Sequence, residues 1–162
     1  MSKPIEINFT WSKDLAIKAS KLYYDYDMKA SSKRYVGWLF IAMMQFGVVG
    51  ALKHDSFGIL FISTFLVLYW YYGRWYLRKG MIEKYYDKSN LDATDVKFVL
   101  KDEGLYYDEE LIDWDNIEKV IKFDDGILLQ TTSNTLFFET SAFKSYEEVK
   151  TFLKLMKNKG KI

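Results

Sequence analysis

Two long apolar runs occupy the first half of the chain. Residues 35–52 are 18 consecutive residues without a charge, and residues 57–73 are 17 more. An α-helix rises about 1.5 Å per residue, so each run would extend roughly 25 Å, close to the ~30 Å hydrocarbon core of a bilayer. Since aromatic residues extend the second run, the pattern predicts a transmembrane helical hairpin over residues 35–77, with spans of about 35–52 and 57–77.

The alternative for these runs is a pair of buried helices in a soluble bundle. A soluble helix normally keeps a polar face, and neither run has one. A chain of 162 residues could not bury two adjacent helices that are apolar on every side. Gln45 lies within the first run, and we expect its amide to hydrogen-bond to the other helix. The small residues Gly47 and Ala51 would pack inside the hairpin or, alternatively, form the seam of a homodimer.

Basic and aromatic residues gather at one end of the predicted hairpin. Lys and Arg residues come before the first span and after the second, whereas the tip has only Lys53. The positive-inside rule therefore predicts that both termini are cytoplasmic, with aromatic rings at the headgroup level on the same side. The predicted membrane-interface residues are Tyr35, Trp38, Tyr69, Trp70, Tyr72, Arg74, Trp75, Arg78 and Lys79. Residues 78–94 would form the juxtamembrane end of the second helix and a linker.

The N-terminal arm, residues 1–34, changes its hydrophobic period partway along. Apolar and polar residues alternate from Ile5 to Thr10, which predicts a short strand that could add to a sheet formed later in the chain. Ser12 is a suitable N-cap for the helical spacing of apolar residues that follows. The predicted amphipathic helix could lie on the membrane surface or pack against the C-terminal part of the chain.

Residues 95–159 have the pattern of a small antiparallel sheet closed by one helix. Alternation and turn residues predict strands at 96–101, 105–107, 111–114, 117–123, 127–131 and 135–139. Asp124-Asp125-Gly126 is the strongest hairpin signal, with Gly126 expected at positive φ. Ser145 and Glu148 predict a capping box at the start of a C-terminal helix. The predicted fold class is an α+β membrane protein, in which a two-helix transmembrane hairpin precedes this sheet module.

The composition narrows the possible chemistry. Residues 1–90 carry 13 Lys and Arg against 7 Asp and Glu, whereas residues 91–162 carry 10 against 15. A basic first half suits anionic lipid headgroups, and an acidic second half suits water. The chain has no Cys and one His, His54, and it lacks the glycine-rich nucleotide-binding motifs. We therefore expect no catalytic residues, no metal or other cofactor, no nucleic acid partner and no enzymatic activity.

Short motifs in the C-terminal part make a family resemblance specific. They are Glu103-Gly104-Leu105, Trp114-Asp115-Asn116-Ile117, Thr140-Ser141-Ala142-Phe143 and Ser145-Tyr146-Glu147-Glu148. With two apolar runs before them, these motifs resemble the YcxB-like family of bacterial membrane proteins over about residues 35–159, although Thr140 stands near a common Pro of the family. The resemblance implies a pleckstrin-homology-like (PH-like) module over residues 95–159, in a multi-pass protein of the bacterial cytoplasmic membrane. The matching residues expected to be structural are Gly104, Trp114, Ile117 and Phe143.

Three kinds of function are compatible with these patterns. The first is a membrane-tethered module that binds a protein partner or a second copy of the chain in the cytoplasm. The second is lipid headgroup recognition, which would require a cluster of the lysines Lys97, Lys101, Lys119 and Lys122. The third is toxin immunity or protection against envelope stress, for which no residue argues. The net charge of −5 over residues 91–162 favours a protein partner.

Overall fold

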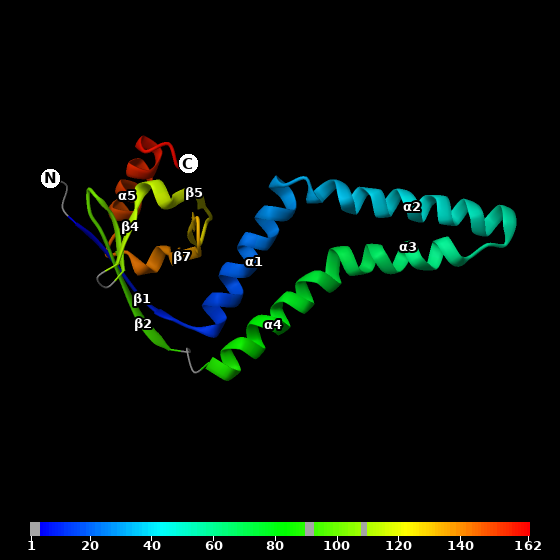
Figure 1. The fold of residues 1–162 in the computed structure, drawn as a ribbon, viewed down its shortest axis with the longest axis horizontal. Helices are drawn as coiled ribbons and strands as arrows, with labels where there is room; N and C mark the ends of the chain where they lie inside the picture. The colour runs from blue at the N-terminus through cyan, green and yellow to red at the C-terminus, as the bar shows by residue number, and fades with distance from the viewer. Residues whose placement is uncertain (1–3, 90–92, 108–109) are drawn as a thin grey trace. The chain divides into compact units, whose positions relative to one another are not determined.

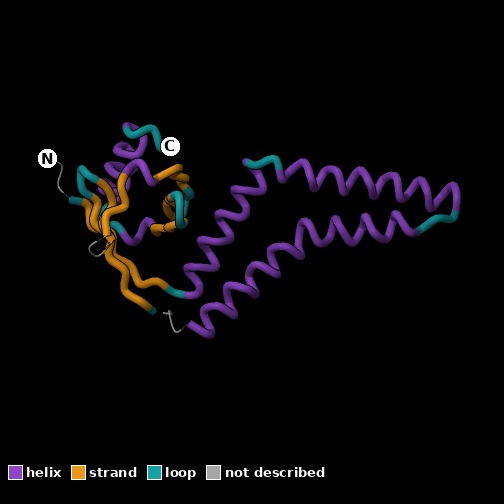
Figure 2. The backbone as a smooth tube through the Cα atoms, viewed as in Figure 1, coloured by secondary structure: helices purple, strands orange, loops and turns teal. Residues whose placement is uncertain are grey.

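The computed structural model describes residues 4–89, 93–107 and 110–162, and the chain divides into two compact units (Figure 1). The first, which we call the β unit, comprises residues 1–15 and 91–162. The second, the helical unit, comprises residues 16–90. The helical unit is therefore inserted in the sequence of the β unit. Figure 2 distinguishes helices from strands by colour, and the combination of helices with two small antiparallel sheets confirms the α+β part of the predicted class.

The helical unit contains an antiparallel hairpin formed by α2 and α3 (Figure 1). Its segments are α1 Lys13–Ala30, α2 Lys33–His54, α3 Gly58–Leu68, the π-helical turn η1 Tyr69–Gly73 and α4 Arg74–Ser89. The connection between α2 and α3 includes Asp55 at φ 51°, in the left-handed region that Asp tolerates better than most residues. The polar tip that separates the apolar runs in the sequence is therefore the turn of this hairpin.

Small residues allow α2 and α3 to approach each other closely. A Cβ atom on Gly47 would come within 2.7 Å of the Leu60 backbone, and Ala51 is buried on the same face. Ser63 is fully buried, and its hydroxyl donates a hydrogen bond to the Ile59 carbonyl oxygen at 2.7 Å. The small residues of the first run thus lie inside the hairpin, in the first of the two predicted arrangements.

The predicted hydrogen bond of Gln45 to the other helix is wrong. Gln45 is exposed, and its amide bonds to none of the described residues. It lies two positions before Gly47, which is about 200° around a helix of 3.6 residues per turn. Because Gly47 faces α3, Gln45 points to the opposite side of α2.

The predicted second span is one continuous helical segment in which the hydrogen-bond pattern changes. Tyr69 has φ −61° and ψ −44°, and Arg74 has φ −59° and ψ −43°, so α3, η1 and α4 follow one another without leaving helical dihedral angles. A π-turn inserts an extra residue and commonly bends a helix, and Figure 1 shows a bend between α3 and α4.

Helix length supports one of the two predicted spans. Among the described residues, one helix, α2, is long and apolar enough to cross a membrane by length and composition. The helix α3 by itself has 11 residues, too few to do so. The membrane hairpin therefore stays a prediction.

The helix α1 packs against α4 through aromatic and basic side chains. The ring centroids of Tyr24 and Trp75 are 5.7 Å apart. Arg78 donates a hydrogen bond from Nε to the Ser20 hydroxyl at 2.8 Å. This arrangement within the helical unit was not one of the two predicted for the amphipathic helix.

The β unit consists of two antiparallel sheets and a C-terminal helix. The four-stranded sheet, in the order β1-β2-β3-β4, has the strands β1 Ile5–Trp11, β2 Thr94–Leu100, β3 Gly104–Tyr107 and β4 Glu110–Asp113. The three-stranded sheet, in the order β5-β6-β7, has the strands β5 Ile117–Lys122, β6 Gly126–Thr131 and β7 Thr135–Glu139. The remaining elements are the 3₁₀ turns η2 Trp114–Asn116 and η3 Thr140–Ala142 and the helix α5 Tyr146–Asn158. The N-terminal strand adds to the sheet as predicted, with Trp11 opposite Thr94.

The apolar stripe of α5 forms part of the core of the β unit. Val149, Phe152 and Met156 are buried, and the Phe152 ring packs edge-on against Phe138 at 6.4 Å and Phe143 at 5.8 Å between centroids. These contacts explain why α5 covers the sheets: its buried side chains fill the space between them.

The N-terminus of α5 has the predicted cap in a modified form. The Ser145 hydroxyl accepts a hydrogen bond from the Glu148 backbone N–H at 3.3 Å, as a capping box requires. The Glu148 carboxylate, however, accepts from the Lys144 backbone N–H at 3.1 Å instead of that of Ser145. The return bond of the box is therefore shifted by one residue.

Two glycines are required by close packing between strands. Gly126 does not have the predicted positive φ, because it begins β6 and has the extended backbone of a strand. Glycine is required there for another reason: a Cβ atom would overlap the Phe138 carbonyl oxygen of β7. At Gly104, in β3, a Cβ atom would lie 2.5 Å from the Ile112 carbonyl oxygen of β4. The glycine of the Glu-Gly-Leu motif is thus explained by contact with the backbone of its neighbouring strand.

Replacing Gly104 with Ala is expected to destabilise the β unit by about 1–3 kcal/mol, because the backbone of β4 must move to admit the methyl group. Urea unfolding of the full-length protein in detergent, followed by near-ultraviolet circular dichroism, measures the change. Gly80→Ala in α4 is the control, since a Cβ there meets nothing within 4 Å. An unchanged unfolding midpoint for Gly104→Ala would show that β4 does not restrict this position.

Candidate functional site

A groove lies between the two sheets of the β unit. It has a volume of about 690 Å³ and is bounded by the four-stranded sheet on one side and by β7 and the β6–β7 turn on the other. The aromatic residues that line it are Phe9, Trp11, Phe98, Tyr107, Phe137 and Phe138. The groove is large enough for a few side chains of a bound segment.

Strand register brings these aromatic rings together. Phe9 lies in β1 and Phe98 in β2, and their rings stack with centroids 6.3 Å apart and planes 7° from parallel. The Phe98 ring also contacts Tyr107 at 4.9 Å and Phe138 at 5.1 Å. Since the rings hold one another from several strands, the floor of the groove is preorganised for apolar contacts.

The rim of the groove is polar and carries little charge. At the β6–β7 turn, Thr131 accepts a hydrogen bond from the Asn134 N–H and donates one to the Asn134 carbonyl oxygen, each at 2.9 Å. Glu110 is the one charged residue among the described residues that line the groove. None of those residues is Lys or Arg, so no side-chain cation among them is placed to pair with an anion.

The four lysines considered for headgroup recognition lie on different sheets. Lys97 is in β2 and forms an ion pair with Glu6, and Lys101 lies 4.3 Å over the Tyr106 ring. Lys119 and Lys122 are in β5, which belongs to the other sheet. Two of the four lysines thus have a described partner, Glu6 for Lys97 and the Tyr106 ring for Lys101.

Glu6 holds together two segments that are far apart in the sequence. Its carboxylate pairs with Lys144 at 2.6 Å and with Lys97 at 3.6 Å. The hydrogen bond from Lys144 and the positive charges of both lysines lower the pKa of Glu6. The same hydrogen bond and the negative charge of Glu6 raise the pKa of Lys144. On β3, a hydrogen bond to Glu103 raises the pKa of the Tyr106 phenol. None of these residues lines the groove, so they provide no acid–base pair within it.

The three large motif residues expected to be structural, Trp114, Ile117 and Phe143, belong to the core. Trp114 is buried and donates from Nε1 to the Asp102 carbonyl oxygen at 2.9 Å, while Lys159 covers its ring at 5.6 Å. Ile117 is fully buried, and Phe143 packs against α5. Each of these side chains contacts protein, and none of them lines the groove.

The predicted membrane-interface residues all belong to the helical unit. Tyr35, Trp38, Tyr69 and Tyr72 are exposed, and Lys79 pairs with Glu83 at 3.6 Å. The Arg74 guanidinium lies over the Trp70 ring at 4.1 Å, and Lys21 lies over the Trp75 ring at 5.1 Å. Arg78 bonds to Ser20. Two of the predicted interface rings, those of Trp70 and Trp75, are thus packed against cations of the same unit.

Metal ligands do not converge in the part of the chain that the structure describes. Within residues 4–89, 93–107 and 110–162, no group of three or more His, Asp or Glu side chains is arranged to hold a metal ion. The groove is lined by apolar and hydrogen-bonding side chains.

Comparison with known protein families agrees with the motifs. Residues 102–156 match the family model described as YcxB-like protein. The match supports the YcxB-like resemblance for the region from the β2–β3 turn to α5, and it does not include β1 or the helical unit. No curated protein and no solved structure matches the chain.

Sequence reasoning did not find the groove. Trp11 and Leu111 line it, and the alternation of β1 continues to Trp11, one residue past the predicted strand. The alternation that continues to Trp11 was the one sequence pattern that could have placed this residue in the strand and on the face of the groove. The pair of Glu6 and Lys144 joins residues 138 positions apart, and no local pattern indicates it.

The lowered pKa of Glu6 predicts a pH dependence of stability. A carboxyl group whose pKa is lower in the folded state stabilises the fold above its unfolded-state pKa, and this contribution is lost as the pH falls through the folded pKa. Glu6→Gln is therefore expected to lower stability at pH 7 and to reduce its loss on acidification below about pH 4. Urea unfolding midpoints from pH 3 to pH 7 measure this, with the exposed Glu118→Gln as the control. Identical pH profiles for Glu6→Gln and the parent would contradict the assignment.

Proposed function

We propose that this protein is a non-enzymatic integral membrane protein of the bacterial cytoplasmic membrane, in which a two-span hairpin presents a PH-like module that binds a protein partner in the cytoplasm. The observation that carries the proposal is the apolar surface of α2 and α3, which faces outward on all sides of the hairpin except the seam between the two helices. The groove of the β unit then supplies the binding surface.

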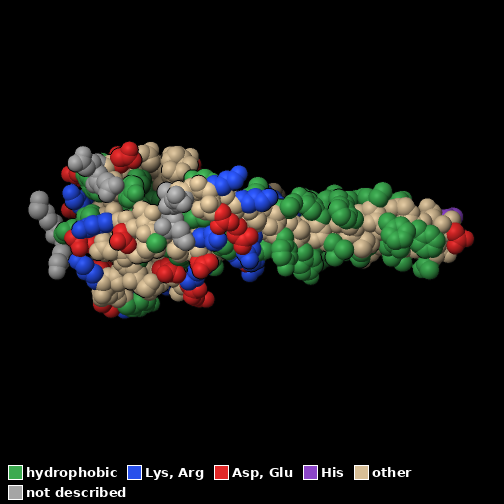
Figure 3. All heavy atoms as spheres, turned by 90° about the horizontal axis from the view of Figure 1, so that it is seen from below, with side chains coloured by type: hydrophobic (Ala, Val, Ile, Leu, Met, Phe, Trp, Pro, Cys, Tyr) green, Lys and Arg blue, Asp and Glu red, His purple; other side chains and the backbone are tan. Residues whose placement is uncertain are grey.

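The exposed side chains of the hairpin are those of a lipid-facing surface. In α2 the buried residues are Gly37, Gly47 and Ala51, and in α3 the one buried residue is Ser63. Large apolar side chains point outward, including Trp38 at 66%, Phe46 at 73% and Phe65 at 69% exposure. Figure 3 shows hydrophobic side chains over the visible side of the hairpin and an acidic side chain at its tip. Soluble proteins rarely expose so continuous an apolar surface.

The pairing of β1 with β2 supports an even number of membrane crossings. These strands pair along their whole length, from Ile5 opposite Leu100 to Trp11 opposite Thr94, and the helical unit is inserted between them in the sequence. A single crossing would place the two strands on opposite sides of the bilayer. If α2 crosses, the chain must return, and residues 58–73 of α3 and η1 are the uncharged helical segment that can do so.

The charge distribution supports a cytoplasmic β unit. The tip of the hairpin carries one lysine, Lys53, whereas its other end carries basic residues on both sides of the spans. They are Lys29, Lys33, Arg34, Arg74, Arg78, Lys79 and Lys84. By the positive-inside rule this end is cytoplasmic, and the β unit is attached to it through α1 and α4.

The strand order and the groove support a PH-like module with a protein partner. A four-stranded meander, a three-stranded meander and a C-terminal helix are the order of elements expected of a PH-like fold. The groove has an aromatic floor and a hydrogen-bonding rim without cations, which suits an apolar peptide segment better than an anionic headgroup. Because residues 91–162 carry a net charge of −5, the partner segment is expected to have basic residues beside its apolar ones.

The proposed topology predicts opposite labelling of two single-cysteine variants. Ser56→Cys at the hairpin tip is expected to react with a membrane-impermeant maleimide in intact cells, whereas Asn158→Cys in α5 reacts only after permeabilisation. The natural chain has no Cys, so each variant carries a unique thiol. Release of the protein by carbonate extraction, or equal labelling at both sites in intact cells, would contradict the two-span topology.

The proposed partner predicts peptide binding that depends on the groove. The full-length protein in detergent is expected to enrich peptides that alternate apolar with basic residues from a display library. Leu111→Glu, in the groove, should weaken the selected peptides at least tenfold, because it places a charge in an apolar contact. Ile162→Glu alters another exposed apolar side chain of the same unit and is the matched control. Equal peptide affinity for the parent and Leu111→Glu would remove the groove from the proposal.

A further inference from the structure

A second cavity, at the base of the hairpin, lies entirely within the helical unit. It is a cleft of about 530 Å³ between α1, the first turns of α2 and the π-turn η1. Gly37 permits this arrangement, because a Cβ atom there would come within 2.6 Å of the Tyr71 hydroxyl. The side chains that line the cleft are three cations, one carboxylate, four aromatic rings and one thioether: Lys21, Lys29, Arg34, Asp25, Tyr24, Trp38, Trp70, Tyr71 and Met28.

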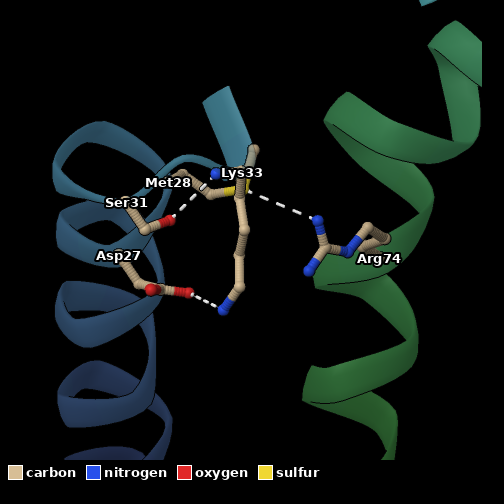
Figure 4. Close-up of polar contacts among 5 residues, drawn as sticks. All are labelled: Asp27, Met28, Ser31, Lys33 and Arg74. Atoms are coloured by element: carbon tan, nitrogen blue, oxygen red, sulfur yellow. Dashed lines mark hydrogen bonds and ion pairs between the residues drawn. The ribbon is translucent and has the colours of Figure 1, made fainter. Parts of the chain in front are cut away.

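Several cations at this cleft have no carboxylate partner. Lys21 pairs with Asp25 at 2.7 Å, but neither Lys29 nor Arg34 forms an ion pair with a described residue. Arg74 covers the Trp70 ring, and its one hydrogen bond goes to the Met28 sulfur at 3.6 Å, which is a weak acceptor (Figure 4).

Figure 4 also shows a neighbouring lysine, Lys33, that does have a carboxylate partner. Lys33 binds Asp27, so this lysine is neutralised within α1 and α2. The cations that line the cleft without a carboxylate partner are therefore Lys29 of α1 and Arg34 of α2. Arg74 of α4 lies beside the cleft, over the ring of the lining residue Trp70. Cations from two helices at the cleft, with a third beside it, favour an anion as the ligand.

Two buried donors beside the cleft also have no acceptor. The Trp70 Nε1–H and the Tyr24 hydroxyl are buried without a hydrogen-bond partner, and both residues line the cleft. Buried polar groups are usually paired, so each such atom calls for an explanation. A ligand with several acceptor oxygens, such as a phosphate group, would supply the missing partners once the covering side chains move aside.

We propose that this cleft binds the phosphate group of an anionic phospholipid of the cytoplasmic leaflet. The proposal rests on the membrane hairpin put forward above, and it places lipid recognition in the helical unit, apart from the groove of the β unit. Exposed Trp38 and Leu39 continue from the cleft onto the apolar surface of α2. The acyl chains of a lipid would lie along these residues while its phosphate meets Lys29 and Arg34, a contact that a free phosphate ion cannot make.

Native mass spectrometry of the full-length protein in a neutral detergent tests the proposal. Dioleoylphosphatidylglycerol is the anionic probe, dioleoylphosphatidylcholine the zwitterionic probe and glycerol 3-phosphate the soluble anion. We expect at least tenfold preference for the phosphatidylglycerol over both others. The double variant Lys29→Gln/Arg34→Gln should lose this preference. The matched control Lys84→Gln/Lys88→Gln removes the same charge from exposed positions of α4 and should retain it.

Each contrary outcome has a distinct meaning. Equal retention of the two lipids, or equal loss in both double variants, would overturn the cleft as a specific site. Binding of glycerol 3-phosphate as tight as that of the lipid would overturn the assignment to a lipid. Carbonate extraction and Ser56→Cys labelling of the same variants show whether the hairpin itself is inserted, so failure of the proposed topology is recognised separately from failure of this site.

Discussion

The pairing of β1 with β2 is the constraint on which the organisation of this chain depends. The two strands form a continuous antiparallel ladder, although the whole helical unit separates them in the sequence. Both connections to the helical unit therefore start from the same end of one ladder, where Trp11 faces Thr94. Any path of the inserted helices has to return to its starting side. If the inserted helices cross a bilayer, the ladder therefore requires an even number of crossings.

The two units bury apolar surface in different ways. In the β unit, Phe138 and Phe143 both pack against Phe152 of α5, as in a protein that folds in water. In the hairpin, close contact is limited to small residues such as Gly47 and Ser63, and the large apolar side chains remain outside. Small residues at the seam are how helices associate when the surrounding solvent is lipid, because lipid offers large side chains as good an environment as protein does.

The charges of the two cavities are complementary to different ligands. The groove of the β unit has aromatic walls and a single charged residue, Glu110, among its described lining residues. The cleft of the helical unit has Lys29 and Arg34 without carboxylate partners and unsatisfied donors beside them. One site is suited to an apolar segment and the other to a phosphate group. The basic and acidic halves of the sequence thus correspond to two surfaces with separate roles in the proposed function.

Local patterns in the sequence determined the elements, and tertiary contacts decided how several of them are used. The strand Thr135–Glu139, the N-cap Ser145 and the apolar stripe of α5 follow from neighbouring residues, so they could be predicted. The π-turn at η1 and the packing that requires Gly126 could not, because both depend on where other segments lie. The same holds for the Glu6 and Lys144 pair and for both cavities. Periodicity reports which side of an element is buried, whereas contacts between distant segments arise only when the chain is folded.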